Sequence, residues 1–522
     1  MAQRIINNFV NFGTDESDMH ILGMGYSQNL YPEIIVDDSP KSTARYYLRS
    51  ILGMEKFIEF EQSYCRGIYV ASSIDRLVAI FGTEVFVVEK DVDDGKFNKI
   101  KVGEVAAGTD RISIAESGGD DPWILIADGY TLHAFKIKGI LSILGNTYQN
   151  LELPHNNNED LIQPTYVTYE YGFLTINDKN TNYFYRSEQY PLESGENNEI
   201  NMRPFTYDHE RREEAPYGFY INADYETDNI AAMISVNSYL FVMGKKSVQM
   251  YTYSGDNNLP FNTTTANASK IGILSPNTLS SINDSIFWLG ANTEGQFGIF
   301  TATQCSNITR ISNNNMERII SKMKNPEDSF GFTWTENGHA FYAITFNSDD
   351  LTFVYDMNTG IWHNRVSTDP NKNEDHKWRY SYSVLFDNKL IFGTDNNLVI
   401  QKTDKFTEHD GNRIIRLRRG GCTIDGYSPF IIDNISFIVN NGYCDTLNPS
   451  IQPKLMFRYS GNGSTFGNER IGYMGRQGQY NYYTEFPRLG IGRIWNFELS
   501  CSENIDFCII NVKILANTIG RF

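Results

Sequence analysis

The sequence has few cysteines, and they lie too far apart to suggest a disulfide framework. Six occur in 522 residues, at Cys65, Cys305, Cys422, Cys444, Cys501 and Cys508. None belongs to a C-x-x-C pair, and the spacing does not match that of zinc ligands. We therefore expect reduced thiols in a protein made in a cytoplasm, with no structural metal.

Long apolar segments are also missing. The first ten residues lack the apolar core of a signal peptide. No stretch approaches the ~18 consecutive apolar residues expected of a membrane helix. We therefore expect neither export nor a membrane span.

Basic residues are scarce relative to acidic ones. The chain has 45 Lys and Arg against 63 Asp and Glu, a net charge of −18. Such a protein would be repelled by bulk DNA and by anionic membranes, so it is not expected to clamp nucleic acid through counterion release. Walls that do not grip phosphates would suit a pore through which DNA slides. An equally consistent explanation is that the acidic excess keeps a large surface soluble.

Helical patterns are scarce, whereas residues typical of strands and turns are abundant. The chain has 32 Tyr and 33 Phe, with many Asn and Gly, which favours an all-β protein with numerous hairpins. One short exception is the run 316–323, whose apolar residues follow helical spacing and predict two turns packed on a sheet edge. At this length more than one domain is expected.

A repeat runs through the middle of the chain. An apolar run followed by glycine recurs, and the glycines lie 47, 115, 46 and 103 positions apart, at Gly82, Gly129, Gly244, Gly290 and Gly393. Weaker hairpin patterns at 173–178 and 344–349 fill the two long gaps. A unit of ~40–50 residues with a few short strands is typical of a β-propeller blade. We predict about six or seven blades within 61–410, with a charged loop inserted near 187–228.

The last hundred residues predict a separate antiparallel β-sandwich-like module over 421–522. Residues 455–460 alternate with period two and run into the turn Gly461-Asn462-Gly463, and a second strand pattern spans 488–500. Gly420-Gly421 indicates a domain junction. Residues 1–60 are left as an N-terminal arm with the first strands.

The one basic cluster lies just before this junction and consists of Arg413, Arg416, Arg418 and Arg419. Arginine binds phosphates and carboxylates through bidentate hydrogen bonds, so these residues are candidates for contact with DNA or with an acidic neighbouring subunit. A solvated linker surface that balances nearby acid is the alternative.

Catalytic and metal-binding patterns are incomplete. Asp91, Asp93 and Asp94 resemble a calcium loop, but Val102 stands where an EF-hand needs glutamate. His363 lacks a nucleophile motif, and we expect it at a strand end, hydrogen-bonded to the backbone. The carboxylate pairs 120–121 and 349–350 lie in turn-like contexts, where glycosidase chemistry is not expected. We predict no enzyme activity and no cofactor.

Several short motifs resemble, in order, a family of short-tailed phage proteins: the tail hub or nozzle, also called the packaged-DNA stabilisation protein. They are 29–33 (NLYPE), 65–69 (CRGIY), 240–244 (LFVMG), 251–256 (YTYSGD), 287–290 (FWLG), 338–342 (GHAFY), 354–363 (VYDMNTGIWH) and the C-terminal module. The resemblance covers nearly the full length, apart from a diverged segment at 187–212.

The resemblance implies a structural role in the virion. Such a protein would form a homohexameric ring under the portal and its adaptor, and would line the DNA exit channel without sequence-specific binding. It would help to retain packaged DNA, and would carry fibres or spikes and a plug or needle. The alternative is a carbohydrate-binding or glycan-hydrolysing propeller, which would need acidic and aromatic residues clustered on loops of several blades.

Overall fold

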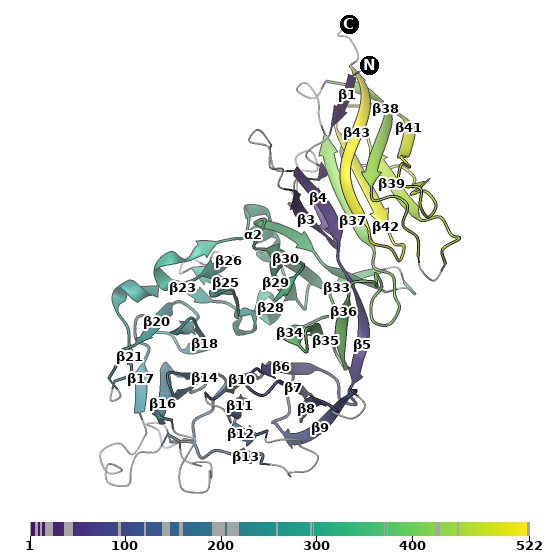
Figure 1. Ribbon diagram of the computed structural model, residues 1–522. Helices are drawn as coiled ribbons and strands as arrows, with labels where there is room; N and C mark the ends of the chain where they lie inside the picture. The colour runs from purple at the N-terminus through teal and green to yellow at the C-terminus, as the bar shows by residue number, and fades with distance from the viewer. Residues whose placement is uncertain are drawn as a thin grey trace, which may run out of the picture.

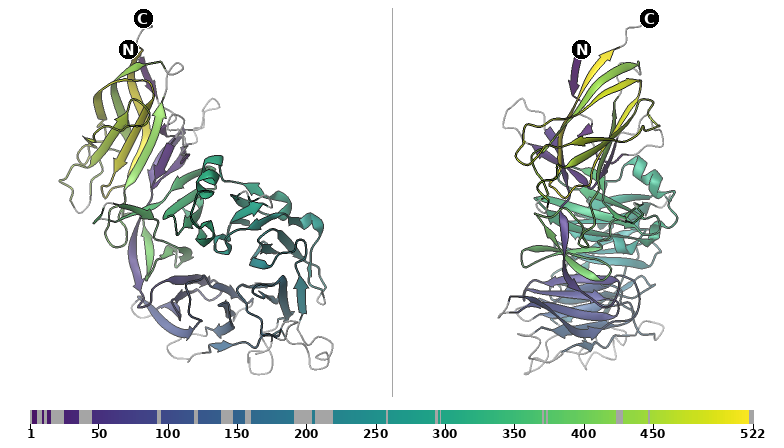
Figure 2. Two further views of the ribbon diagram at one scale, coloured as in Figure 1. Left: turned by 180° about the vertical axis from the view of Figure 1, so that it is seen from behind. Right: turned by 90° about the vertical axis from the view of Figure 1, so that its right-hand side faces the viewer.

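The computed structural model (Figure 1) describes residues 2–5, 9–10, 13–15, 25–35, 45–91, 95–118, 122–137, 147–155, 160–190, 204–205, 219–256, 259–292, 295, 297–369, 371–372, 374–422, 428–445 and 448–518. A β-propeller forms one part and a β-sandwich the other, so the predicted all-β fold is confirmed. The first strand, β1 (Ala2–Ile5), and the end of the last strand, β43 (Cys508–Thr518), lie at the tip of the sandwich that is farther from the propeller (Figure 2).

The propeller has seven blades within the described residues, each made of four or five antiparallel strands. The first three blades are β6 (Cys65–Ala71), β7 (Arg76–Phe81), β8 (Glu84–Lys90) and β9 (Phe97–Glu104); β10 (Ser113–Glu116), β11 (Trp123–Ala127), β12 (Leu132–Lys136) and β13 (Gln149–Asn150); and β14 (Val167–Glu170), β15 (Phe173–Asn177), β16 (Tyr183–Gln189) and β17 (Phe219–Asn222). The fourth and fifth are β18 (Ile230–Val236), β19 (Tyr239–Gly244), β20 (Val248–Tyr253), β21 (Phe261–Asn262) and β22 (Ala268–Ser269); and β23 (Ile271–Ile273), β24 (Ser280–Ile282), β25 (Ser285–Asn292), β26 (Phe297–Ala302) and β27 (Thr309–Arg310). The last two are β28 (Ser329–Glu336), β29 (His339–Phe346), β30 (Leu351–Asp356) and β31 (Ile361–Asn364); and β34 (Tyr382–Phe386), β35 (Lys389–Gly393), β36 (Asn397–Lys402) and β5 (Gly53–Glu59).

The repeat found in the sequence is the second strand of a blade. Four of its glycines end or follow that strand, in β7, β11, β19 and β35, and Gly290 lies inside β25. The weaker patterns at 173–178 and 344–349 coincide with β15 and with the end of β29. Side chains of the second strand are buried on both faces because a neighbouring blade covers each face, which explains the continuous apolar runs.

Each pair of neighbouring blades encloses its own apolar cluster, so the core is a ring of seven clusters among the described residues. The ring closes through the N-terminal segment, because β5 pairs antiparallel with β36 and forms the outer strand of the seventh blade. The sequence-based boundary had placed the start of the propeller later, at residue 61. Because this distant strand closes the ring, β36 is not left as an unpaired strand at the edge of the seventh blade.

The predicted short helix is confirmed as α2 (Asn314–Ile320). Asn313 caps it by accepting a hydrogen bond of 2.8 Å from the Met316 backbone N–H. Its buried Met316 and Ile320 pack in the cluster between the fifth and sixth blades. Four 3-10 turns also occur among the described residues, η2 (Thr265–Asn267), η3 (Pro276–Thr278), η4 (Cys305–Asn307) and η5 (Pro326–Asp328).

The sandwich packs two sheets around one apolar cluster. One sheet contains β1 (Ala2–Ile5), β3 (Leu30–Ile35), β4 (Arg45–Ser50), β38 (Phe430–Val439), β41 (Thr484–Gly492) and β43 (Cys508–Thr518). The other contains β2 (Gly25–Gln28), β37 (Arg416–Cys422), β39 (Lys454–Ser460), β40 (Arg470–Tyr473) and β42 (Trp495–Cys501). N-terminal strands therefore complete both sheets of the C-terminal module.

The strand pattern at 488–500 is two strands, not one. β41 and β42 belong to opposite sheets, and the chain crosses between them at Arg493, whose N–H donates to the Gly461 carbonyl (3.1 Å). Gly492 permits the crossing, because a Cβ there would lie 2.7 Å from the Gly461 oxygen. Period-two alternation on both sides of the turn hid this break in the sequence.

A continuous sheet joins the two parts. β2 pairs with β37 of the sandwich on one side and meets β31 of the sixth blade on the other, so nine strands form one sheet. Asn29 follows β2 and fastens the junction: its side-chain N–H groups donate to the carbonyls of Val366 (3.0 Å) and Ile415 (2.9 Å). Its side-chain oxygen accepts from Val366 N–H (3.0 Å). The remaining hairpin, β32 (Val366–Asp369) and β33 (Glu374–Lys377), starts at this point.

Candidate functional site

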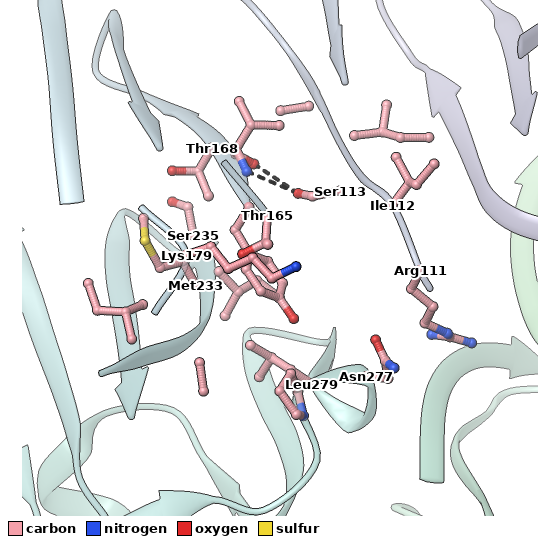
Figure 3. A pocket seen from close by; sticks show the side chains of 18 of the residues that line it. Arg111, Ile112, Ser113, Thr165, Thr168, Lys179, Met233, Ser235, Asn277 and Leu279 are labelled. Atoms are coloured by element: carbon pink, nitrogen blue, oxygen red, sulfur yellow. Dashed lines mark hydrogen bonds between the residues drawn. The ribbon is translucent and has the colours of Figure 1, made fainter. Parts of the chain in front are cut away.

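Two cavities lie beside the inner strands of the propeller. The axial cavity, about 840 Å³, is bounded mainly by β10, β14 and β18 of the second to fourth blades (Figure 3). The rim cavity, about 1100 Å³, is bounded by residues where the inner strands of the first, sixth and seventh blades begin and by the hairpin of β32 and β33. Arg111, Asn277 and Tyr382 line both cavities and therefore separate them.

Arg111 is a cross-link through the centre of the propeller. It precedes β10 in the second blade, yet its guanidinium donates to the carbonyls of Gly331 (2.7 Å) and Ser381 in the sixth and seventh blades. The guanidinium carbon also lies 4.0 Å from the ring centre of Tyr382 and 4.9 Å from that of Phe330. Hydrogen bonds and cation–π contacts thus hold this side chain across the axis.

Two of the four carboxylates that line the axial cavity, Glu116 and Glu170, accept hydrogen bonds from side chains or backbone of the propeller blades. Glu116 accepts from the Ser73 hydroxyl and from the Ser72 backbone N–H (3.2 Å), and Glu170 accepts from the Ser235 hydroxyl (2.7 Å). Within the described part of the chain, no group of three His, Cys, Asp or Glu side chains is placed to hold a metal ion. The axial cavity therefore has a mixed polar and apolar lining.

The structure separates the four arginines of the basic cluster. Arg416 and Arg418 point into the protein from β37 and are fully buried. Arg416 donates to the carbonyls of Glu503 (2.6 Å) and Ile505 (3.1 Å). Arg418 donates to the carbonyls of Phe9 (2.7 Å) and Gly13 (3.1 Å), and burial lowers its pKa to about 9.

These contacts correct the expectation for Arg416 and Arg418, because their guanidinium groups bind carbonyls of the same chain and do not reach its surface. Arg419 pairs with Glu498 (2.9 Å), which also binds Arg458. Arg413 is exposed. Contact with DNA or a neighbouring subunit therefore stays a prediction for Arg413 and Arg419.

The other sequence candidates occupy structural positions where they are described. His363 lies in β31, fully buried, and neither ring nitrogen has a hydrogen-bond partner among the described residues, so the expected backbone bond is absent. Burial lowers its pKa well below the ordinary value. Asp349 accepts from Lys324 N–H (3.1 Å) and Asp350 from His376 (2.6 Å). The pair 120–121, residues 92–94 and most of 187–228 lie outside the described residues.

An ion cluster that no sequence pattern predicted lies at the junction between the two parts. His339 at the start of β29 lies 3.1 Å from Glu33 of β3 and 2.9 Å from Asp356 of β30. Burial opposes its protonation, but the hydrogen bonds with Asp356 and Glu33 outweigh burial and raise the pKa of His339 to about 9. Glu33 comes from the sandwich sheet, so a charged His339 fastens the sandwich to the sixth blade.

A second buried ion pair lies near this cluster: a guanidinium nitrogen of the fully buried Arg365 is 3.2 Å from a carboxylate oxygen of Glu336. Its guanidinium carbon is 4.6 Å from the Trp334 ring centre and 4.7 Å from that of Trp378.

No helix of the described chain is long and apolar enough to cross a membrane.

Comparison with known proteins gives one family match. Residues 211–407 match the family model described as "Bacteriophage P22 Gp10, beta-propeller". The match covers less than half of the chain, and the blades that it contains are the fourth to the seventh. No curated protein matches the sequence.

Solved structures resemble the chain only weakly. The CNH domain of AfRom2 has 9% identity and a TM-score of 0.39, and the alignment covers 67% of this chain and 99% of that domain. The N-terminal domain of Nup159 has 9% identity and a TM-score of 0.36, covering 72% and 98%. An exo-β-1,3-galactanase from Phanerochaete chrysosporium has 10% identity and a TM-score of 0.27, covering 78% and 97%. These similarities do not bear on function, whereas the family match supports a phage tail-related protein family and a structural role in the virion.

Proposed function

We propose that this protein is the hub or nozzle of a short phage tail. It would form a homohexameric ring under the portal and adaptor, line the DNA exit channel and help to retain packaged DNA. Tail fibres or spikes and a plug or needle would attach to it. The observation that carries the proposal is the family match over the fourth to seventh blades, together with collinear motifs in the rest of the chain.

The physical properties of the chain support this role. A net charge of −18 disfavours tight binding to the phosphates of passing DNA. The propeller and sandwich share a continuous sheet, so they would keep a fixed relative orientation under load. A cyclic ring repeats one interface around its axis, which lets a modest contact build a stable tube.

The sandwich offers a surface that suits such an interface. Tyr443, Tyr480 and Tyr483 are exposed, and the rings of Tyr443 and Tyr480 lie 6.2 Å apart. Ile471 and Tyr473 are exposed on β40, the outer strand of its sheet. Exposed aromatic and aliphatic side chains gathered at one place are typical of protein–protein contacts.

Electron microscopy of negatively stained protein, alone and mixed with portal–adaptor complexes, tests the proposal. We expect sixfold rings, or caps on the adaptor. Tyr480→Asp should abolish rings while the monomer stays folded, and Tyr130→Asp, which changes an exposed propeller tyrosine, should leave them intact. A chain that stays monomeric and ignores the adaptor would refute the hub assignment.

The proposal includes no catalytic activity, cofactor or metal. Turnover of a glycan by the purified protein, abolished by a single carboxylate substitution, would contradict it.

A further inference from the structure

A third cavity, about 640 Å³, lies on the face of the propeller where the inner strands end. We call it the tyrosine cavity. It is formed by the second, third and fourth blades, and its lining includes Trp123, Glu170, Tyr171, Gln189, Tyr190 and Tyr253. Its volume is within the range of small-ligand sites.

The tyrosine cavity is rich in aromatic rings, some of them exposed. Tyr171 and Tyr190 are 41% and 68% exposed. The rings of Tyr171 and Tyr253 are stacked, with centres 4.5 Å apart and planes at 16°. Gly172 makes room for this arrangement, because a Cβ there would lie 2.9 Å from the Tyr190 ring.

Tyr171 occupies a backbone position that disfavours its side chain. In the third to seventh blades, the turn between the first two strands has two residues with positive φ. The first of these is Asn237, Asn283, Asn337 or Asp387 in the other four blades, but Tyr171 (φ 52°) in the third. Asn and Asp tolerate this conformation, whereas a tyrosine there is unusual. Local folding therefore does not explain the choice of tyrosine at this tip.

The polar groups of the cavity define the ligand further. Among the described residues that line the cavity, Glu170 is the only charged one, so this lining offers no cation to a phosphate or a nucleic acid. Trp123 is 4% exposed, and its ring N–H has no hydrogen-bond partner among the described residues. Gln189 adds an amide, which donates to the Tyr171 carbonyl (3.2 Å). A ligand hydroxyl would supply the acceptor that the buried Trp123 N–H lacks.

Aromatic residues also commonly bind quaternary ammonium ions, which they surround with rings arranged as a cage. The Tyr171 and Tyr253 rings face each other, so they cannot surround a cation between them. They leave one outer ring face as a flat platform, beside an N–H donor, an amide and a carboxylate. A sugar has this combination of features, an apolar face of C–H groups with a rim of hydroxyls.

We propose that the tyrosine cavity is a saccharide-binding site that takes one or two sugar units of a polysaccharide. Tyr171 and Tyr190 would pack on the apolar faces of the sugar rings, and Glu170, Gln189 and Trp123 would bind hydroxyls. The site involves residues of a single chain. It therefore does not depend on ring assembly, and its failure would leave the hub proposal standing.

The test uses the full chain on a printed array of bacterial surface polysaccharides and defined neutral oligosaccharides. The affinity for the strongest binder is then measured by titration calorimetry. Tyr171→Asn is the main variant, because it removes the ring but supplies the residue that the same turn has in three other blades. Glu170→Gln removes the charge, and Tyr130→Ala is the matched control at an exposed tyrosine outside the cavity.

We expect Tyr171→Asn and Glu170→Gln each to weaken binding about tenfold, as for the loss of one aromatic or hydrogen-bonding contact. Tyr130→Ala should leave the affinity unchanged, and all variants should keep the parent's far-UV circular dichroism. The proposal is overturned if the intact chain binds no saccharide, or if Tyr171→Asn and Tyr130→Ala bind equally well. Displacement of the sugar by tetramethylammonium at low concentration would also overturn it, in favour of a cation cage.

Discussion

Raising the pH from 6 to 9.5 should loosen the junction between the sandwich and the propeller, because His339 loses its charge in this interval. The imidazolium lies between Glu33 of the sandwich sheet and Asp356 of the sixth blade, at 3.1 and 2.9 Å. In the folded protein its pKa is raised from 6.5 to about 9. The folded state thus binds a proton that the unfolded state has already released, and stability falls as pH rises through this range.

The magnitude follows from the two pKa values. The interval from 6.5 to about 9, at 1.36 kcal/mol for each pH unit, corresponds to about 3 kcal/mol of stabilisation. All of this contribution is present below pH 6.5, and it is lost once the pH exceeds about 9. Replacement of His339 by Gln removes the titrating group and should therefore flatten the dependence.

Two measurements check this prediction. Selective isotope labelling of histidine allows the His339 ring to be titrated by NMR, with an expected midpoint near pH 9. Urea unfolding at several pH values should show a decline of about 3 kcal/mol that His339→Gln abolishes. His376→Gln, which changes an exposed histidine paired with Asp350, should leave the decline intact. An equal slope in the parent protein and in His339→Gln would refute the assignment.

Three further predictions concern stability and can be measured by urea unfolding. Arg418→Ala should lower the free energy of unfolding by about 2–3 kcal/mol because it leaves buried carbonyls unpaired, whereas Arg413→Ala at the surface should stay within about 0.5 kcal/mol. Gly272→Ala should destabilise more than Gly118→Ala, because its Cβ would lie 2.2 Å from backbone atoms of the β19–β20 turn, against 3.5 Å to the nearest atom at Gly118. Trp288→Ala, in the cluster between the fourth and fifth blades, should cost about 3–5 kcal/mol; a smaller effect than for Gly118→Ala would contradict this account of the core.

The blades could be predicted from the sequence because the second strand of each blade is specified locally. Its side chains are buried on both faces, so it appears as a short apolar run, and a turn follows at once. Five such runs end in or near a glycine, and 173–178 and 344–349 supply the other two. The closing strand could not be found this way. β5 pairs with β36, far along the chain, and its residues Gly53–Glu59 include lysine and glutamates on an outer edge.

The arginine cluster shows a different limit. Residues 416–419 alternate between buried and partly exposed positions along β37, and two arginines occupy the buried positions. Charged side chains are usually exposed, so the composition of this segment indicated a surface. The guanidinium groups of Arg416 and Arg418 donate to main-chain carbonyls of the loop before β43 and of the N-terminal segment. No local sequence pattern reveals these distant partners. The tyrosine cavity was hidden for a related reason, since its rings come from three blades.

The junction decides whether the chain can act as one rigid piece of a tail. A propeller and a sandwich joined by a flexible linker would turn independently, and ring contacts made by the sandwich would not fix the propeller. Here β2 continues the sheet of the sixth blade into the sandwich, and Asn29 bonds to Val366 and Ile415 on either side. His339 adds an ion pair with Glu33 across the same junction. Because these contacts involve main-chain atoms and a buried charge, they resist rotation about the junction. A subunit held in a ring by its sandwich would therefore hold its propeller, and the tyrosine cavity on it, in one orientation.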